Sequence, residues 1–171
     1  MSTTAEAIEQ GLGAVEAQYG RPLTELGGYS GVMAVYLTGL ATAIWQLKAK
    51  RRLPSGFTAG DLALVALATH KLSRTISRDA VTSPARAPFT HFEGPSSPGE
   101  VKEKVAGGGV RKAVGELITC PFCMDQWIAS GFIVGLAAAP RVTRFVASIF
   151  AVRAGADLLQ FGYAAANKAA E

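Results

Sequence analysis

Long runs of apolar residues, interrupted by polar and basic segments, dominate the pattern along the chain. Residues 26–47 include no charged side chain over 22 positions, and the basic run 48–52 follows directly. A helix of about 20 apolar residues crosses the hydrocarbon core of a bilayer. Tyr29 and Trp45 lie toward the two ends of this run, where interfacial aromatic residues are favoured. The pattern therefore predicts a first transmembrane helix over residues 26–47.

Two further apolar segments, in the second half of the chain, also predict transmembrane helices. Residues 118–139 carry one charge, Asp125, and a helix of this length would measure about 33 Å. Residues 142–163 contain Arg153 and Asp157, which lie one helical turn apart. Charged side chains inside a membrane usually face protein and pair with one another. We therefore predict a third span, with Arg153 and Asp157 as an intramembrane ion pair.

Three other segments are predicted to lie outside the hydrocarbon core. Apolar residues recur at helical spacing over residues 2–19, which predicts a short amphipathic helix. Residues 61–77, capped by Thr58 or Asp61, become basic after only nine uncharged positions. A helix with so short an apolar part is predicted to be interfacial or half-inserted. Residues 79–116 contain four prolines and a triple glycine, which predict a largely irregular loop.

The predicted fold class is therefore an all-α, multi-pass membrane protein with about three transmembrane helices. Residues 1–25 are predicted to form an N-terminal amphipathic segment, and residues 26–171 a single helical membrane domain. The composition agrees with this class, because 49% of the residues are hydrophobic and only 18% are charged, whereas soluble domains average about 25% charged residues. A length of 171 residues argues against a multidomain machine, and two cysteines exclude a disulfide scaffold.

The distribution of basic residues predicts an orientation in the membrane. If the helix 61–77 does not cross, residues 48–116 and the C-terminal tail share one side, with 13 Lys and Arg residues against three on the other. Lysine and arginine are enriched on the cytoplasmic side of membrane proteins. The long loop and the C-terminus are therefore predicted to be cytoplasmic, with the N-terminus outside.

Two segments, taken together, resemble one known family. The first includes the basic stretch Lys71-Leu72-Ser73-Arg74 and the later Pro84-Ala85-Arg86, and the second is Cys120-Pro121-Phe122-Cys123, followed by Trp127. In this order they resemble the bacterial membrane family catalogued as domain of unknown function 1360, a resemblance that extends over residues 58–165. That family includes a sporulation-associated membrane protein. The resemblance implies a location in a bacterial cell membrane and implies no established activity.

Cys120 and Cys123 are the first candidate site, because residues at i and i+3 share one face of a helix. Two thiolates could supply half of a tetrahedral zinc site, with His91 in the flexible loop as a better third ligand than His70. A Cys-x-x-Cys pair at a helix N-terminus also suits redox chemistry. Packing of two small, soft side chains is a third interpretation. The sequence leaves these alternatives open.

Basic residues on the helix 61–77 and just beyond it form a second candidate site. They could cradle an anion such as a lipid phosphate, or form a solvated face that rests on anionic headgroups. No aromatic platform or nucleic-acid-binding fold accompanies them, so nucleic acid is not a predicted partner. The residues of this set are His70, Lys71, Arg74, Arg78 and Arg86.

The sequence assigns no catalytic machinery, and no cofactor is predicted. We predict a structural or interaction subunit, an anchor whose partners are the lipid bilayer and either another protein or further copies of this chain. Two alternatives stay open. One is a membrane-associated thiol redox or metal-dependent component that uses Cys120 and Cys123. The other is a transporter-like oligomer subunit built around Arg153 and Asp157, because charged residues inside a membrane are functional candidates.

Overall fold

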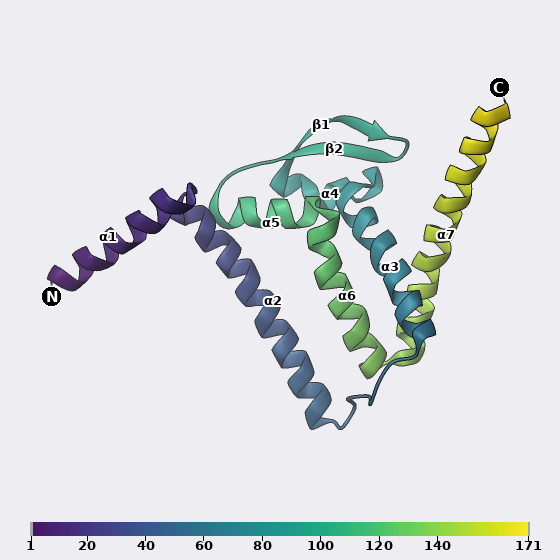
Figure 1. The fold of residues 1–171 in the computed structure, drawn as a ribbon, viewed down its shortest axis with the longest axis horizontal. Coiled ribbons are helices and arrows are strands. Elements are labelled where there is room, and N and C mark those ends of the chain that lie inside the picture. Colours follow the sequence, from purple (N-terminus) through teal and green to yellow (C-terminus); the bar gives the residue numbers. More distant parts are fainter. Residues whose placement is uncertain (1, 171) are drawn as a thin grey trace.

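The computed structural model describes residues 2–170, and most of them are helical. The long helices are α2 (Leu23–Ala49), α3 (Ala59–Arg78), α6 (Pro121–Ala138) and α7 (Pro140–Ala170), and they run alternately in opposite directions (Figure 1). The prediction of a mostly helical protein is confirmed. The description all-α is wrong in one respect, because strands β1 (Thr90–Ser97) and β2 (Glu100–Val105) form an antiparallel hairpin.

Helices α3, α6 and α7 pack together and enclose the hydrophobic core. Ala68 of α3 and Ala147 of α7 have no exposed surface, and such small side chains let two helix backbones approach closely. Phe132 and Leu136 of α6 belong to the same buried cluster. The buried core residues are Val65, Ala68, Phe132, Leu136 and Ala147.

The first two helices agree with the sequence pattern. Helix α1 (Ser2–Tyr19) ends at Gly20, whose positive φ of 70° turns the chain before Pro22. Helix α2 covers the predicted uncharged run and extends it at both ends. Its N-terminal half packs against α5, and its C-terminal end approaches the end of α6 (Figure 1).

Helix α3 begins where the sequence predicted, because the Thr58 side chain accepts a hydrogen bond from the Asp61 backbone N–H at 3.0 Å. The interfacial or half-inserted position of α3 stays a prediction, and the structure shows how this helix packs within the protein. Helix α3 lies against both α6 and α7. The physical reason is that its charged residues, Asp61, Lys71 and Arg74, have oppositely charged partners on other elements and thus face protein.

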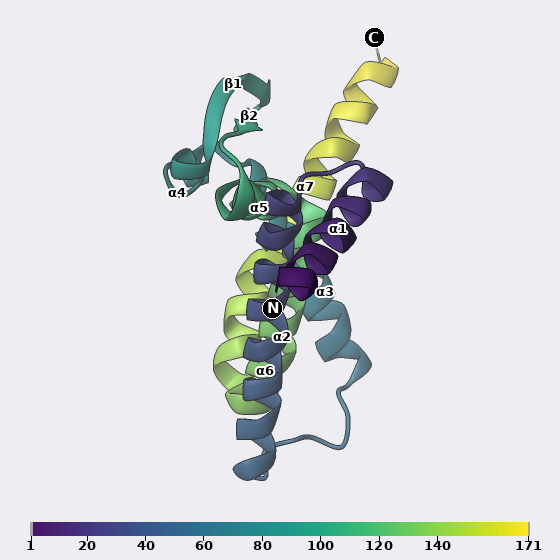
Figure 2. The same ribbon diagram turned by 90° about the vertical axis from the view of Figure 1, so that its left-hand side faces the viewer.

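Residues 79–119, which we call the polar cap, include residues 79–116, which are not the irregular loop that their prolines and glycines predicted. They form two 3-10 turns, η1 (Ala80–Thr82) and η2 (Ala87–Phe89), the short helix α4 (Ser83–Arg86), the hairpin, and helix α5 (Gly109–Thr119). Pro84 and Pro88 occupy first-turn positions, where a missing N–H is harmless. Gly99, with φ of 81°, supports the hairpin turn. The cap lies at one end of the long helices (Figure 2).

The predicted single helix over residues 118–139 is broken at Cys120. Helices α5 and α6 meet there at 80°, because a proline disfavours helical backbone in the residue before it and Cys120 adopts an extended conformation before Pro121. Within residues 2–170, one helix, α2, is long and apolar enough to cross a membrane, or two if the bent pair forms one span. Helix α7, the third predicted span, does not meet these criteria.

The connection between α2 and α3 lies at the opposite end of the long helices from the polar cap (Figure 1). Arg52, in this connection, donates a hydrogen bond to the carbonyl oxygen of Ala138 at the end of α6. The predicted arrangement, in which residues 48–116 share one side of a membrane, stays a prediction. It assumes that α3 does not cross, whereas in the structure the connection between α2 and α3 and the polar cap lie at opposite ends of the bundle (Figure 1).

Candidate functional site

The two cysteines lie at the corner where the polar cap meets the helical bundle. Cys120 is the N-cap of α6, and its Sγ accepts a hydrogen bond from the Cys123 backbone N–H at 3.3 Å. The Cys123 thiol in turn donates to the Cys120 Sγ across 2.7 Å. Both cysteines are unbridged; Cys120 is half-buried and Cys123 is exposed. The structure thus brings the predicted thiol pair into direct contact.

Polar contacts fasten the cap to α2 beside this corner. Glu116 accepts a short hydrogen bond from the Tyr29 hydroxyl, and Lys112 pairs with Glu25 at 2.8 Å. This hydrogen bond to Glu25 raises the pKa of Lys112. The backbones also approach closely, since a Cβ added at Gly28 would lie 2.5 Å from a carbonyl oxygen of α5. These contacts fix α5, and therefore the position of Cys120, relative to α2.

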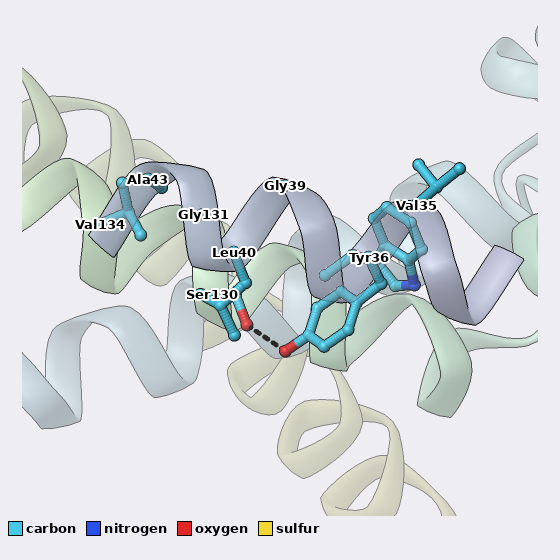
Figure 3. A pocket seen from close by; sticks show the side chains of 9 residues that line it. Val35, Tyr36, Gly39, Leu40, Ala43, Ser130, Gly131 and Val134 are labelled. Atoms are coloured by element: carbon cyan, nitrogen blue, oxygen red, sulfur yellow. Dashed lines mark hydrogen bonds between the residues drawn. The ribbon is translucent and has the colours of Figure 1, made fainter. Parts of the chain in front are cut away.

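A groove between α2 and α6 extends from Cys123 along the bundle. Its first part, about 300 Å³, lies between Cys123, Glu116 and Met33, and its second part, about 200 Å³, continues toward the other end (Figure 3). Tyr36 and Trp127 line both parts, with ring centroids 5.1 Å apart in an edge-to-face arrangement. The groove is mainly apolar, and sequence analysis missed it because it depends on how α2 and α6, which are distant in the sequence, lie beside each other.

The predicted zinc ligands do not come together. His91 lies exposed on β1, and among residues 2–170 no three His, Cys, Asp or Glu side chains are grouped so that they could hold a metal ion. A structural zinc site needs four ligands. Of the two chemical interpretations of the pair, the geometry therefore favours thiol chemistry over metal binding.

Arg86, predicted as part of an anion site, is instead a buried structural residue. Its side chain is 1% exposed and its Nε donates to Glu103, itself 6% exposed, at 2.5 Å. The guanidinium also donates to the Thr82 hydroxyl and to the backbone carbonyls of Ile76 and Asp79, where α3 ends. Arg86 therefore joins the end of α3 to the hairpin and has no surface for a lipid.

Two more of the predicted basic residues are paired with carboxylates. Lys71 bonds to Asp157 at 2.6 Å, and Arg74 to Glu100 at 2.5 Å. Burial disfavours the charged form of Glu100, but hydrogen bonds from Arg74 and Ser97 outweigh it, so the pKa of Glu100 is lowered. His70 is exposed and Arg78 is half-buried. The predicted basic face is thus neutralised over most of its length.

The predicted ion pair between Arg153 and Asp157 is replaced by two pairs that cross between helices. Asp157 bonds to Lys71, while Arg153 lies 3.6 Å from Asp79 and 3.5 Å from the Thr75 hydroxyl. Both α7 residues face α3, and α3 offers a partner to each. A third crossing pair, Arg144 to Asp61 with contacts of 2.7 and 3.0 Å, was not predicted. The feature of the sequence that could have indicated this pair is the presence of opposite charges near the starts of two largely apolar helices.

Comparison with known sequences places these features in a family. The profile described as "Protein of unknown function (DUF1360)" matches residues 64–163, which is more than half of the chain. The chain belongs to this family. The DUF1360 segment contains the thiol pair, the buried arginine and most of α3 and α7. It confirms the family resemblance inferred from the sequence.

A curated relative and the solved structures add to this comparison. "Sporulation protein YjcA" of Bacillus subtilis (strain 168) is 26% identical over 102 residues, which cover 58% of this chain and 86% of that protein. No solved structure matches the chain. The family assignment therefore identifies relatives without assigning an activity.

Proposed function

We propose that this DUF1360 protein is a multi-pass protein of the bacterial cell membrane in which α2, α3, α6 and α7 all cross the bilayer. The observation that carries the proposal is the amount of apolar surface on the outer helices, because water-exposed patches of this size are rare. The hairpin and the short helices gather instead in the cap at one end (Figure 1). The exposed apolar side chains include Met33, Val35, Leu37, Ile44 and Trp45 on α2, and Phe145, Ile149, Val152, Leu158 and Phe161 on α7.

The charged residues of α3 and α7 are compatible with crossing because they pair between the helices. The Lys71 side chain is only 12% exposed and contacts Asp157 directly. Paired charges that face protein reduce the unfavourable free energy of placing an ion in hydrocarbon. The lengths also fit, since α3 with 20 residues and α6 with 18 residues would measure about 30 and 27 Å at 1.5 Å per residue.

We propose that the basic turn between α2 and α3 faces the cytoplasm. Four Lys and Arg residues, at positions 48–52, follow the first span directly, whereas Arg21 alone precedes it closely. Charges that flank the first span usually dominate orientation. The antiparallel helices then place the polar cap and both termini on the other side of the membrane, which revises the cytoplasmic cap predicted from the sequence.

Labelling of single cysteines tests both parts of this arrangement. In a background with Cys120→Ser and Cys123→Ser, Ser96→Cys in the hairpin and Ser55→Cys in the turn are treated with an impermeant maleimide. We expect Ser96→Cys to react in intact cells, and Ser55→Cys only after permeabilisation. Reaction of both from one side would refute the four crossings, and the reverse pattern would refute the orientation.

Within the membrane, we propose that the protein acts as a structural or interaction subunit that self-associates through α2. The face of α2 that points away from the groove is exposed and consists mainly of small residues. Small residues at this spacing let two membrane helices approach closely. Three of the five residues of the predicted basic site, Lys71, Arg74 and Arg86, are paired with carboxylates within the chain, which favours a protein partner over an anionic lipid. The face comprises Gly27, Gly31, Ala34, Thr38 and Ala41.

Two matched substitutions test the self-association. A Cβ at Gly31 or at Gly39 would meet nothing within 4 Å in the monomer, but only Gly39 lines the groove. We expect Gly31→Leu to weaken dimers in detergent about tenfold, or about 1.4 kcal/mol, and Gly39→Leu to leave them unchanged. Dilution-dependent light scattering measures the dimer fraction. Monomeric wild-type protein, or equal effects of the two variants, would contradict the proposal.

A further inference from the structure

We propose that Cys120 and Cys123 are a thiol–disulfide exchange pair that transfers two electrons to a disulfide co-reactant. The contact of their sulfur atoms at 2.7 Å carries the inference, because the two thiols can join without rearrangement of α6. The break between α5 and α6 holds them there, since Pro121 starts a new helix and leaves Cys120 extended at its N-cap. The inference goes beyond the proposed function and requires neither membrane crossing nor self-association.

The local geometry assigns different roles to the two sulfur atoms. The Cys120 Sγ accepts hydrogen bonds from the backbone N–H and the thiol of Cys123, and it lies at the positive end of the α6 dipole. Each of these contacts stabilises negative charge on that sulfur, so Cys120 is the nucleophile. Cys123 is exposed and lines the groove, and its sulfur lies where it can resolve a mixed disulfide on Cys120.

The proposed reaction is balanced in two steps. The Cys120 thiolate attacks one sulfur of the co-reactant, so that a mixed disulfide forms and the co-reactant's S–S bond breaks to release one thiolate. The Cys123 thiolate then attacks the Cys120 sulfur, forms the intramolecular disulfide and releases the second thiolate. The chain loses two electrons, the co-reactant is reduced to two thiols, and the two protons of the cysteines pass to those products.

Oxidation of the full-length protein by glutathione disulfide tests the pair, because the chain has only two cysteines. Protein in detergent is equilibrated with glutathione buffers, quenched with acid, and analysed by intact mass after maleimide labelling. We expect both thiols to disappear together, with glutathione adducts below about a tenth of the protein, because a neighbouring thiol resolves the adduct rapidly. Wild-type protein that keeps both thiols in excess glutathione disulfide, or accumulates two adducts, would overturn the proposal.

Variants of the pair test the assigned roles and the geometry. Cys123→Ser should trap a glutathione adduct on Cys120 about tenfold faster than Cys120→Ser traps one on Cys123, since thiolate character sets the rate. The matched control Cys123→Ser/Phe122→Cys moves the second thiol to position i+2, which does not face Cys120, at a site where the native side chain is exposed, and it should not close. Equal trapping rates, or ready closure of this control, would refute the geometric argument. The wild-type measurement needs no variant and stands even if one of them fails to fold.

Discussion

Removal of the Arg86 side chain provides the sharpest test of how the polar cap is held to the bundle. Arg86→Ala would leave Glu103, which is 6% exposed, as a buried carboxylate without its ion-pair partner. The carbonyl oxygens of Ile76 and Asp79 would also lose their guanidinium donor. The loss of one partner from a buried ion pair destabilises a protein by about 3–5 kcal/mol. We therefore expect the cap to open about a thousandfold more often, at 1.4 kcal/mol per tenfold change.

The matched control is an exposed ion pair in the same hairpin. Lys102 lies 3.3 Å from Glu93, and their side chains are 67% and 36% exposed. Exposed pairs of this kind contribute about 0–1 kcal/mol, so Lys102→Ala should have little effect. The double variant Arg86→Met/Glu103→Leu should be more stable than Arg86→Met alone, because no buried charge is left without a partner.

Hydrogen–deuterium exchange of the detergent-solubilised protein measures the effect, since backbone amides in α4 and β2 report local opening of the cap. Protection should fall strongly in the cap for Arg86→Ala and stay near the wild-type level in the core of α6. If Arg86→Ala and Lys102→Ala reduced cap protection equally, the conclusion that Arg86 is the main attachment of the cap would be refuted.

Three further predictions concern other contacts. Gly28→Ala should loosen α5 from α2 and lower the thermal midpoint, because its Cβ would collide with the α5 backbone, whereas Gly31→Ala should not. Lys71→Ala and Asp157→Ala should show a coupling free energy of about 0.5–3 kcal/mol in a double-mutant cycle of denaturant unfolding, and additive effects would contradict the pair. Because the pKa of Glu100 is lowered in the folded protein, its stabilising contribution should be complete above the usual glutamate pKa of about 4.3 and disappear as the pH falls through the folded value. Thermal midpoints of Glu100→Gln should lack that part of the pH dependence.

Features that depend on neighbouring residues could be predicted from the sequence. Helix α2 follows from its uncharged run, and the start of α3 follows from the Thr58 cap. The contact between Cys120 and Cys123 follows from their spacing at a helix N-terminus. Each of these depends on interactions across a few residues, where helix geometry allows few alternatives.

Features that depend on distant residues could not be predicted. Arg153 and Asp157 suit a pair within one helix, but the orientation of α7 toward α3 gives each a different partner. Arg86 resembled a surface cation because its buried partner, Glu103, lies on a hairpin whose glycines and prolines conceal the strand pattern. Tertiary packing decides these contacts, and local sequence patterns do not encode it.

The pairing of α3 with α7 has a consequence for the order of events during synthesis. The partners of Lys71 and Asp61 are 86 and 83 residues further along the chain. At about 5–20 residues per second, a ribosome needs about 4–17 s to reach them. Throughout that interval the charged side chains of α3 lack their native partners. Entry of α3 alone into the lipid is therefore unfavourable. If α3 and α7 cross the bilayer as proposed, we expect α3 to be held at the insertion machinery, or at the membrane surface, until α7 emerges and the two helices enter the bilayer together.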